Sequence, residues 1–289
     1  MTGDASQIRP RRSLLFMPGA NARAMEKAKQ LDCDTILFDL EDAVAPDAKA
    51  AARDAVAAVV EAGGYGYREL VVRCNALETP WGSADIAAFA QAPISALLFP
   101  KVESLTQVDA LVAALDANGC ARPIWVMIES PTAILDLTTF AGHPRIEALV
   151  IGTSDLVTEM HGRHTLHRHN LDYALQRCVL VARHFGKPIF DGVHLDFRNL
   201  ESLKLICESG RDMGFDGKTL IHPSHLEITN AAFGYSAAEV EHAHQVLTVW
   251  RAALQAGKGV AVLDGKLVEN MHAAEAERVV AYAEAIARR

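Results

Sequence analysis

The chain has 289 residues, of which 50% are hydrophobic and 22% charged, and its formal net charge is −8. A chain of this length forms one large domain or two small ones. The negative charge argues against a nucleic-acid-binding protein, because such domains carry a basic face. No run of 18 apolar residues predicts a membrane span. The five cysteines form no CxxC pair, which is typical of reduced thiols and predicts a cytoplasmic protein.

Short apolar runs recur along the chain at regular intervals and predict eight β-strands. Each run is unbroken by polar alternation, as expected of strands that are buried on both faces. The predicted strands are Ser13–Met17, Thr35–Asp39, Leu70–Arg73, Ala96–Phe99, Ile124–Ile128, Ala148–Gly152, Pro188–Val193 and Lys218–Ile221.

Ala-rich or amphipathic segments lie between most of these strands and predict helices. They are Ala22–Leu31, Asp47–Ala62, Leu105–Asn118, Leu171–Phe185 and Leu200–Met213. Eight strand–helix units of this length predict an α/β protein with a TIM (β/α)8 barrel. A doubly wound open sheet is the alternative, which the eight repeats and the lack of a dinucleotide fingerprint disfavour.

Two further helical segments, Ala237–Ala256 and Ala273–Ala287, follow the eighth strand and are joined by GKGVAVLDGKLVEN. A closed barrel does not need this segment. We therefore expect a barrel domain over residues 1–230 that carries the catalytic site, and a helical extension over residues 231–289. The extension is expected to pack outside the barrel or to reach a neighbouring subunit, in a homo-oligomer such as a trimer or hexamer.

Glu129 and Asp155 follow two consecutive predicted strands. Successive strands of a parallel barrel end at the same rim, so the two carboxylates are expected to meet there. Two carboxylates with room for water suit Mg²⁺. The competing interpretation is that both are ordinary loop carboxylates.

Three acids, Asp39, Glu41 and Asp42, crowd the end of the second strand. Their mutual repulsion raises pKa values unless a cation or a metal compensates for it. Arg73 ends the third strand and needs a partner. It either pairs with one of these acids or grips a carboxylate or developing enolate of the substrate.

Basic residues follow the first and fourth strands. Asn21, Arg23 and Lys27 lie at a Pro-Gly turn and the helix after it, where a phosphate can bind, although a plain turn with a solvated helix explains them equally well. Lys101 is either a Schiff-base lysine of an aldolase without a metal or an ordinary ion-pair partner.

Histidines gather in HGRHTLHRH, at residues 161–169. Zinc prefers more defined spacings, so a basic loop over the barrel mouth is the favoured interpretation. Asp191, His194 and His222 at the ends of the last two strands are as consistent with structural as with catalytic roles.

Several motifs together resemble the citrate lyase beta-subunit-like family, which includes the malyl-CoA and citramalyl-CoA lyases. The resemblance runs from about Arg11 to the C-terminal helix. It rests on RRSLLFMPGANARAMEKA, FDLEDAVAPDAKAAAR, VRCN, MIES, IGTSDL and GFDGKTLIHPSHLEITNAAF, in this order.

The resemblance implies a TIM barrel with a C-terminal segment, Mg²⁺ as cofactor and carbon–carbon cleavage of a 3-hydroxyacyl-CoA. The family's metal ligands match Glu129 and Asp155, and its substrate-gripping arginine matches Arg73. Its elements for binding coenzyme A (CoA) fall near Phe16, Asn21, Arg23, Lys27, Ile221 and His222.

Relatives of this kind carry an aspartate in the C-terminal segment, which an adjacent subunit's active site uses. Here Glu269 aligns with that position and Asp264 competes with it. Glutamate keeps the acid but lengthens it by one methylene, which could shift activity between lyase, condensing and thioesterase chemistry. A surface carboxylate on a lid is the alternative.

The expected function is therefore that of a Mg²⁺-dependent lyase. It would cleave citramalyl-CoA or malyl-CoA to pyruvate or glyoxylate and acetyl-CoA or a related acyl-CoA. Arg73 would stabilise developing charge, Glu269 or Asp264 would transfer a proton, and Asp39, Glu41 and Asp42 would orient Arg73 and metal-bound water. Three alternatives stay open: a malyl-CoA-type thioesterase, a metal-dependent aldolase on free keto acids, and a citrate lyase beta-like subunit of a larger complex.

Overall fold

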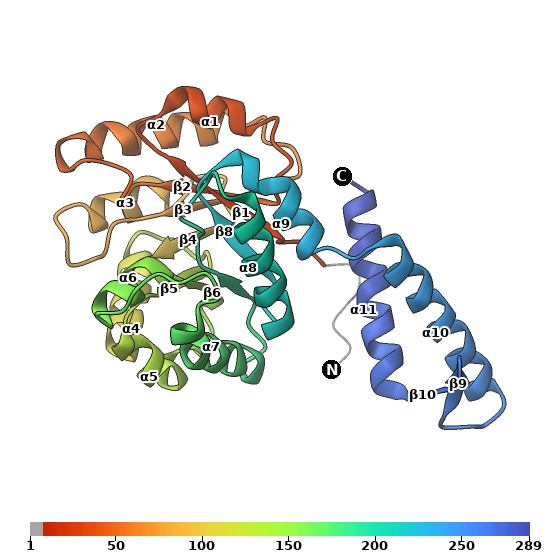
Figure 1. Ribbon diagram of the computed structural model, residues 1–289. Coiled ribbons are helices and arrows are strands. Elements are labelled where there is room, and N and C mark those ends of the chain that lie inside the picture. The colour runs from red at the N-terminus through yellow and green to blue at the C-terminus, as the bar shows by residue number, and fades with distance from the viewer. Residues whose placement is uncertain (1–7) are drawn as a thin grey trace. The chain divides into compact units, whose positions relative to one another are not determined.

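The computed structural model describes residues 8–289 and contains a closed eight-stranded parallel barrel (Figure 1). Each strand pairs with the next, and β8 closes the barrel by pairing with β1. The strands are β1 (Ser13–Pro18), β2 (Thr35–Asp39), β3 (Glu69–Arg73), β4 (Ala96–Phe99), β5 (Ile124–Ile128), β6 (Ile146–Ile151), β7 (Ile189–Asp191) and β8 (Gly217–Leu220). The expected TIM barrel is confirmed, and every predicted strand exists with its ends within two residues.

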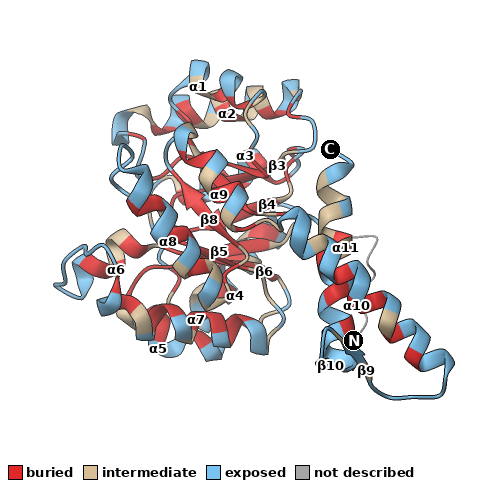
Figure 2. Ribbon diagram, turned by 45° about the vertical axis from the view of Figure 1, so that its right-hand side comes forward, coloured by how far each residue is buried: buried red, intermediate tan, exposed pale blue. Residues whose placement is uncertain are grey.

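Helices cover the outside of the barrel, and Figure 2 shows their outer faces exposed around the buried strands. They are α1 (Ala22–Ala28), α2 (Lys49–Ala62), α3 (Gly82–Phe89), α4 (Leu105–Ala117), α5 (Pro131–Phe140), α6 (Thr153–Glu159), α7 (Asp172–His184), α8 (Leu200–Met213) and α9 (Leu226–Ala232). Short 3-10 turns precede three of them, at Pro46–Ala48, His169–Leu171 and Pro223–His225. The sequence analysis did not predict α3, α6 and α9, which have only seven or eight residues each; α1 is as short, but it was predicted as part of a longer segment, residues 22–31.

The chain divides into two compact units, one over residues 11–233 and one that joins residues 234–289 to the described residues 8–10. The second unit contains α10 (Ala237–Gln255), the hairpin strands β9 (Ala261–Leu263) and β10 (Lys266–Val268), and α11 (Asn270–Ala287). The division of function between residues 1–230 and 231–289 stays a prediction, and residues 1–7 lie outside the described residues.

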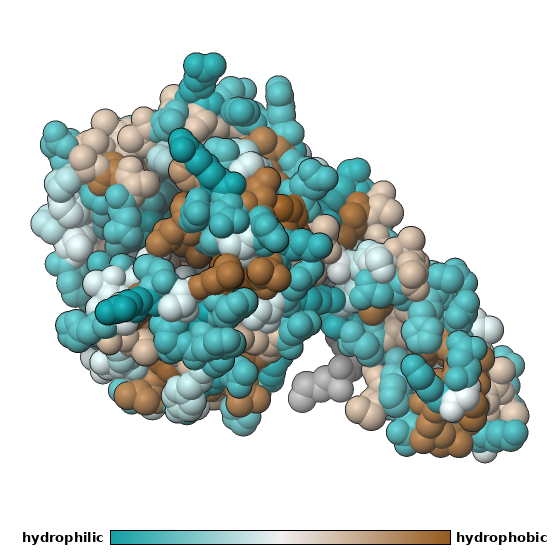
Figure 3. Space-filling view, viewed as in Figure 1, coloured by the Kyte–Doolittle hydropathy of each residue, from teal (hydrophilic) through white to brown (hydrophobic). Residues whose placement is uncertain are grey.

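Helices α10 and α11 enclose a small apolar core of their own that includes Trp250 and Val268. The hairpin was not predicted, although Asp264 and Gly265 carry the signal for it. Both have positive φ, at 49° and 75°, as the two central residues of a type I′ turn require. Apolar residues of the hairpin, such as Val262 and Leu267, are exposed, and Figure 3 shows brown side chains gathered over it.

Two apolar layers hold the barrel together. Alternate strand residues such as Leu37, Trp125 and Phe190 fill its interior, and the intervening residues pack against the helices. The N-terminal ends of the strands are closed by charge. Arg11 donates to Glu69 at 2.7 Å and to Glu147 at 2.9 Å. Polar residues at this end of a barrel serve stability, which leaves the opposite end for function.

No helix within residues 8–289 is long and apolar enough to cross a membrane.

A buried ion cluster fixes β7 and β8 to the neighbouring helices. Asp191 accepts hydrogen bonds from Lys218 Nζ at 2.7 Å and from Arg168 Nη1 at 2.8 Å. All three residues are buried. Although burial alone would raise the pKa of Asp191, Lys218 and Arg168 lower it. A carboxylate that neutralises two buried cations is costly to remove.

We therefore predict that Asp191→Asn destabilises the fold by about 3–5 kcal/mol, because it leaves two buried cations without a counter-charge. Asp116→Asn is the matched control. It breaks an ion pair with Arg145 in which Asp116 is 60% exposed, so the expected loss is below about 1 kcal/mol. Urea unfolding of both variants measures the difference, and equal small losses would contradict the structural role given to the cluster.

Candidate active site

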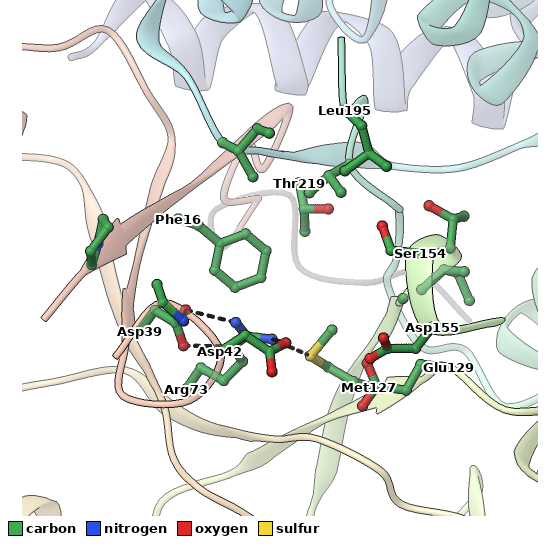
Figure 4. Close-up of a pocket in the computed structure, with 17 residues that line it drawn as sticks. Phe16, Asp39, Asp42, Arg73, Met127, Glu129, Ser154, Asp155, Leu195 and Thr219 are labelled. Carbon is green, nitrogen blue, oxygen red and sulfur yellow. Dashed lines mark hydrogen bonds and ion pairs between the residues drawn. The ribbon is translucent and has the colours of Figure 1, made fainter. Parts of the chain in front are cut away.

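A cavity of about 400 Å³ opens at the C-terminal ends of the barrel strands. Its lining comes from seven of the eight strands or the segments after them, and β4 is the exception. Figure 4 shows that the charged side chains of the lining gather on one side of the cavity. Arg73 lies beside Asp39 and Asp42, and Glu129 and Asp155 lie together on the other side of Met127.

Glu129 follows β5 directly and is held by backbone on two sides. It is 3% exposed, and its Oε1 accepts a hydrogen bond from the backbone N–H of Lys101 at 2.7 Å. Lys101 has a φ of 55°, so its amide is held in the left-handed region that non-glycine residues rarely adopt. On the opposite side, a Cβ added to Gly152 would lie 2.5 Å from Glu129 Oε2. The glycine is therefore needed for the carboxylate to occupy its position.

Asp155 lies in the first turn of α6, three residues after Gly152, and is half-buried. Its carboxylate and that of Glu129 lie side by side in Figure 4. The structure thus brings together the two acids that the strand spacing placed at one rim. The helix, which the sequence did not predict, is what turns Asp155 toward the cavity.

The buried carboxylate of Glu129, with Asp155 beside it, favours binding of a cation. Burial, together with the nearby Glu41 carboxylate, raises the pKa of Glu129 to about 7. A divalent cation between Glu129 and Asp155 would relieve this penalty, and carboxylate oxygens are donors that Mg²⁺ prefers. Within residues 8–289, no group of three His, Cys, Asp or Glu residues is arranged to hold a metal. Water and substrate would complete a two-carboxylate site.

Arg73 is the centre of the acidic side of the cavity. Its Nε and Nη2 donate to the two oxygens of Asp39, each at 2.7 Å. Its Nη1 lies 2.8 Å from Glu41 and 3.4 Å from Asp42, and the guanidinium stacks over the Phe16 ring at 4.7 Å. Arg73 therefore uses its bidentate edge, Nε and Nη2, to pair with Asp39 of β2, which is one of the two roles expected from the sequence. Only Nη1 is directed away from Asp39.

The acidic loop after β2 is held by a lysine that sequence reasoning missed. Lys49 Nζ donates to the carbonyls of Leu40 at 2.8 Å and Glu41 at 2.7 Å. Asp39 also accepts from the backbone N–H of Glu41 at 2.9 Å. Burial lowers the pKa of Lys49. In the sequence, Lys49 reads as an ordinary lysine near the start of an Ala-rich helix, so no local pattern marks its role.

Lys101 does not have the environment of a Schiff-base nucleophile. Its side chain is 59% exposed, with Nζ 3.6 Å from Glu41. Partial burial alone would lower its pKa, but Glu41 and Asp42 outweigh this and raise it. A raised pKa keeps the amine protonated, whereas imine formation needs a free amine. The ion-pair interpretation of Lys101 therefore agrees with the structure.

The predicted CoA-binding residues separate into two groups. Phe16 and Ile221 line the cavity. Asn21, Arg23, Lys27 and His222 are exposed. Asn21 caps α1 by accepting from the Ala24 N–H at 3.0 Å, and His222 Nδ1 lies 2.7 Å from Ser224 Oγ. Their role in CoA binding stays a prediction.

Both candidate acids of the C-terminal unit have local structural roles. Asp264 forms the β9–β10 turn described above. Glu269 precedes α11 and caps it reciprocally with His272, whose Nδ1 accepts from the Glu269 N–H at 3.1 Å. Their participation in an active site stays a prediction.

The raised pKa of Glu129 has a measurable consequence for stability. Its folded value of about 7 lies above the ordinary glutamate value of roughly 4.3, so the folded state binds more protons in between. The metal-free protein should therefore lose stability as the pH rises from about 4.5 to 7. Glu129→Gln should reduce this loss by roughly 1–3 kcal/mol, because the amide does not ionise and still accepts the Lys101 N–H.

Urea unfolding in the presence of a chelator, at several pH values, measures this difference. Glu159→Gln, which replaces an exposed carboxylate of α6, is the control and should leave the profile unchanged. Identical pH profiles for wild type and Glu129→Gln would contradict the burial argument. Part of the slope should remain in the variant, because burial also raises the pKa of Glu41 to about 7.

Comparisons with known proteins give the fold and the site a context. The chain is 47% identical over 283 residues to a (3S)-malyl-CoA thioesterase of Cereibacter sphaeroides (strain KD131 / KCTC 12085), covering 98% of each chain. It is 31% identical to the citrate lyase subunit beta of Leuconostoc mesenteroides subsp. cremoris, covering 96% of this chain and 94% of that protein. The structure of CitE from Mycobacterium tuberculosis in complex with magnesium, acetoacetate and coenzyme A is similar with a TM-score of 0.75. It shares 25% identity and covers 94% of this chain and 97% of that chain.

The first of these relatives contradicts the expected carbon–carbon lyase. A protein that matches this chain almost from end to end is named for the hydrolysis of a thioester, the reaction that the sequence analysis kept only as an alternative. The motifs behind the lyase expectation are those of the family rather than of one reaction within it. A model of the HpcH/HpaI aldolase/citrate lyase family matches residues 12–223, and the chain belongs to this family.

Proposed function

We propose that this protein is a Mg²⁺-dependent thioesterase that hydrolyses a malyl-CoA-type thioester to free CoA and the hydroxy dicarboxylate. The 47% identity to a (3S)-malyl-CoA thioesterase supports the reaction. The observation in the structure that carries the proposal is the pair Glu129 and Asp155. One is a buried carboxylate fixed by the Lys101 amide, and the other lies beside it in the same cavity.

Glu129 and Asp155 would hold Mg²⁺. The structure of CitE in complex with magnesium, which has the same fold, supports the choice of this metal. When bound, the ion supplies a Lewis acid and a template for the carboxylate and hydroxyl oxygens of the substrate. In this arrangement the acid end of the substrate would be recognised at Glu129 and Asp155, and the thioester would extend across Met127 toward Arg73.

Arg73 would stabilise the negative charge that develops on the thioester carbonyl oxygen during attack by water. Asp39 holds the guanidinium by two hydrogen bonds, so its direction is fixed before substrate binds. Nη1 is the donor available for this role. Because Glu41 and Asp42 also contact Nη1, substrate must compete with them or displace them.

A carboxylate must take a proton from the attacking water and return one to the CoA thiolate as the carbon–sulfur bond breaks. We assign this role to Glu269 of a neighbouring subunit, with Asp264 as the competing residue, in a homo-oligomer such as a trimer or hexamer.

The test is incubation of the purified protein with (3S)-malyl-CoA, with and without Mg²⁺. Free CoA and malate should appear together only with the metal. Glu129→Gln should lower this turnover by more than about a hundredfold, since metal-ligand shells are sensitive even to changes in their outer partners. Glu159→Gln should retain it. Release of glyoxylate with acetyl-CoA, in place of free CoA, would contradict the proposed hydrolysis.

Gly152 gives a second test that does not depend on turnover. Gly152→Ala places a Cβ 2.5 Å from Glu129 Oε2, so the carboxylate must move and Mg²⁺ affinity should fall roughly 10–100-fold. Isothermal titration with Mg²⁺ measures the change. Gly162→Ala is the matched control, because its Cβ would meet no atom closer than 3.5 Å. Unchanged Mg²⁺ affinity in Gly152→Ala would remove Glu129 as a ligand.

A further inference from the structure

A second cavity, of about 340 Å³, lies beside the active-site cavity and plays no part in the reaction described above. We call it the loop cavity. It is enclosed by the α6–α7 segment, the β7–α8 segment and the start of α8. Its polar lining includes Arg163, His164, Arg168, His194, Asn199 and Ser202. Four of these six carry or can carry a positive charge, and Asp196 is the acid of the lining.

The positive charge of the loop cavity is only partly balanced, by Asp196 in its lining and by Asp191 behind it. Neither Arg163 nor His164 forms an ion pair with another described residue, and both are exposed at the mouth. Arg168 is only 8% exposed and shares the single carboxylate of Asp191 with Lys218. Burial lowers the pKa of Lys218, whereas the arginine stays protonated, so Arg168 keeps a positive charge directly behind the cavity.

Hydrogen-bond donors line the same space. Ser202 Oγ donates to the Asn199 carbonyl at 2.9 Å, so His194 Nε2, which lies 2.9 Å from Ser202 Oγ, is the donor of that pair. Asn199 caps the 14-residue helix α8, whose N-terminus adds a partial positive charge. Burial lowers the pKa of His194, and its ring N–H is used within the wall of the cavity. The groups that remain for an oxyanion are Arg163 and His164 at the mouth and the N-terminus of α8.

We propose that the loop cavity binds a phosphate group. The phosphate comes either from a free phosphate-class anion or from the CoA part of the thioester, and the cavity's donors recognise both in the same way. A phosphate bound in the loop cavity would also affect the active-site cavity, because Thr153, Val193 and Leu195 line both cavities. Thr153 opens α6 two residues before Asp155, so an anion held here would bias the position of that carboxylate.

The site also accounts for the segment at residues 161–169, whose basic residues have no role in the reaction itself. Arg168 has a φ of 54°, a left-handed conformation that places its side chain inward onto Asp191 while Arg163 remains at the mouth. A solvated basic loop explains the exposed residues, and the ion pair with Asp191 explains the buried arginine, but neither explains the cavity behind the loop.

The experiment measures binding without turnover, so its outcome is independent of the proposed thioesterase activity. Inorganic phosphate, CoA and dephospho-CoA are titrated into wild-type protein, Arg163→Gln and Arg251→Gln by calorimetry. Arg251 lies exposed on α10, outside the lining of the loop cavity, and is the matched control for the loss of one charge. Because Arg163 is exposed, its substitution should not affect folding.

We expect Arg163→Gln to weaken at least one phosphate-bearing ligand by roughly tenfold, and Arg251→Gln to weaken none. Weakened binding of inorganic phosphate identifies a free anion as the ligand. Weakened binding of CoA alone identifies the CoA molecule, and dephospho-CoA then tells whether its 3′-phosphate or its diphosphate is recognised. If Arg163→Gln binds all three ligands as wild type does, the proposal is wrong.

Discussion

The contact between Arg73 and Asp39 is the constraint on which the rest of the site depends. Arg73 ends β3 and Asp39 ends the neighbouring strand β2, so strand pairing alone brings the two side chains together. Two parallel hydrogen bonds then fix the guanidinium. Without this cation, Asp39, Glu41 and Asp42 would repel one another at the mouth of the barrel. With it, the loop after β2 closes over the cavity and is tied down by Lys49.

The acidic rim is left short of positive charge, and this shortage defines what the site can bind. Arg73 and the half-exposed Lys101 face five carboxylates, counting Glu129 and Asp155. A divalent cation restores the balance locally and brings with it an affinity for the acid end of a substrate. The loop cavity has the opposite imbalance. Two neighbouring cavities of opposite charge suit a ligand that chelates a metal at one end and carries phosphates at the other.

Much of the barrel could be predicted because its strands are buried on both faces and therefore appear as uninterrupted apolar runs. The proximity of Glu129 and Asp155 followed from the rule that parallel strands end at one rim. The amide of Lys101 could not be predicted, because a left-handed backbone at a lysine leaves no mark in composition or periodicity. Gly152 was visible, directly after a strand, but the atom it makes room for was not. The choice between lyase and hydrolase was missed because the motifs that carry the resemblance belong to a family whose members are named for either reaction.

The hydrogen bond that orients Glu129 comes from the main chain, and this has a consequence for how the site tolerates change. At position 101 the side chain is not what holds the carboxylate, so many residues that accept the left-handed backbone would preserve the geometry, and glycine would adopt it without strain. Position 152 has no such freedom, since every other amino acid adds the Cβ that meets Glu129. Positions 101 and 152, which both lie against the Glu129 side chain, therefore tolerate substitution to different degrees. In a diversified library, variation at residue 101 would tune the charge at the rim, whereas residue 152 would return to glycine.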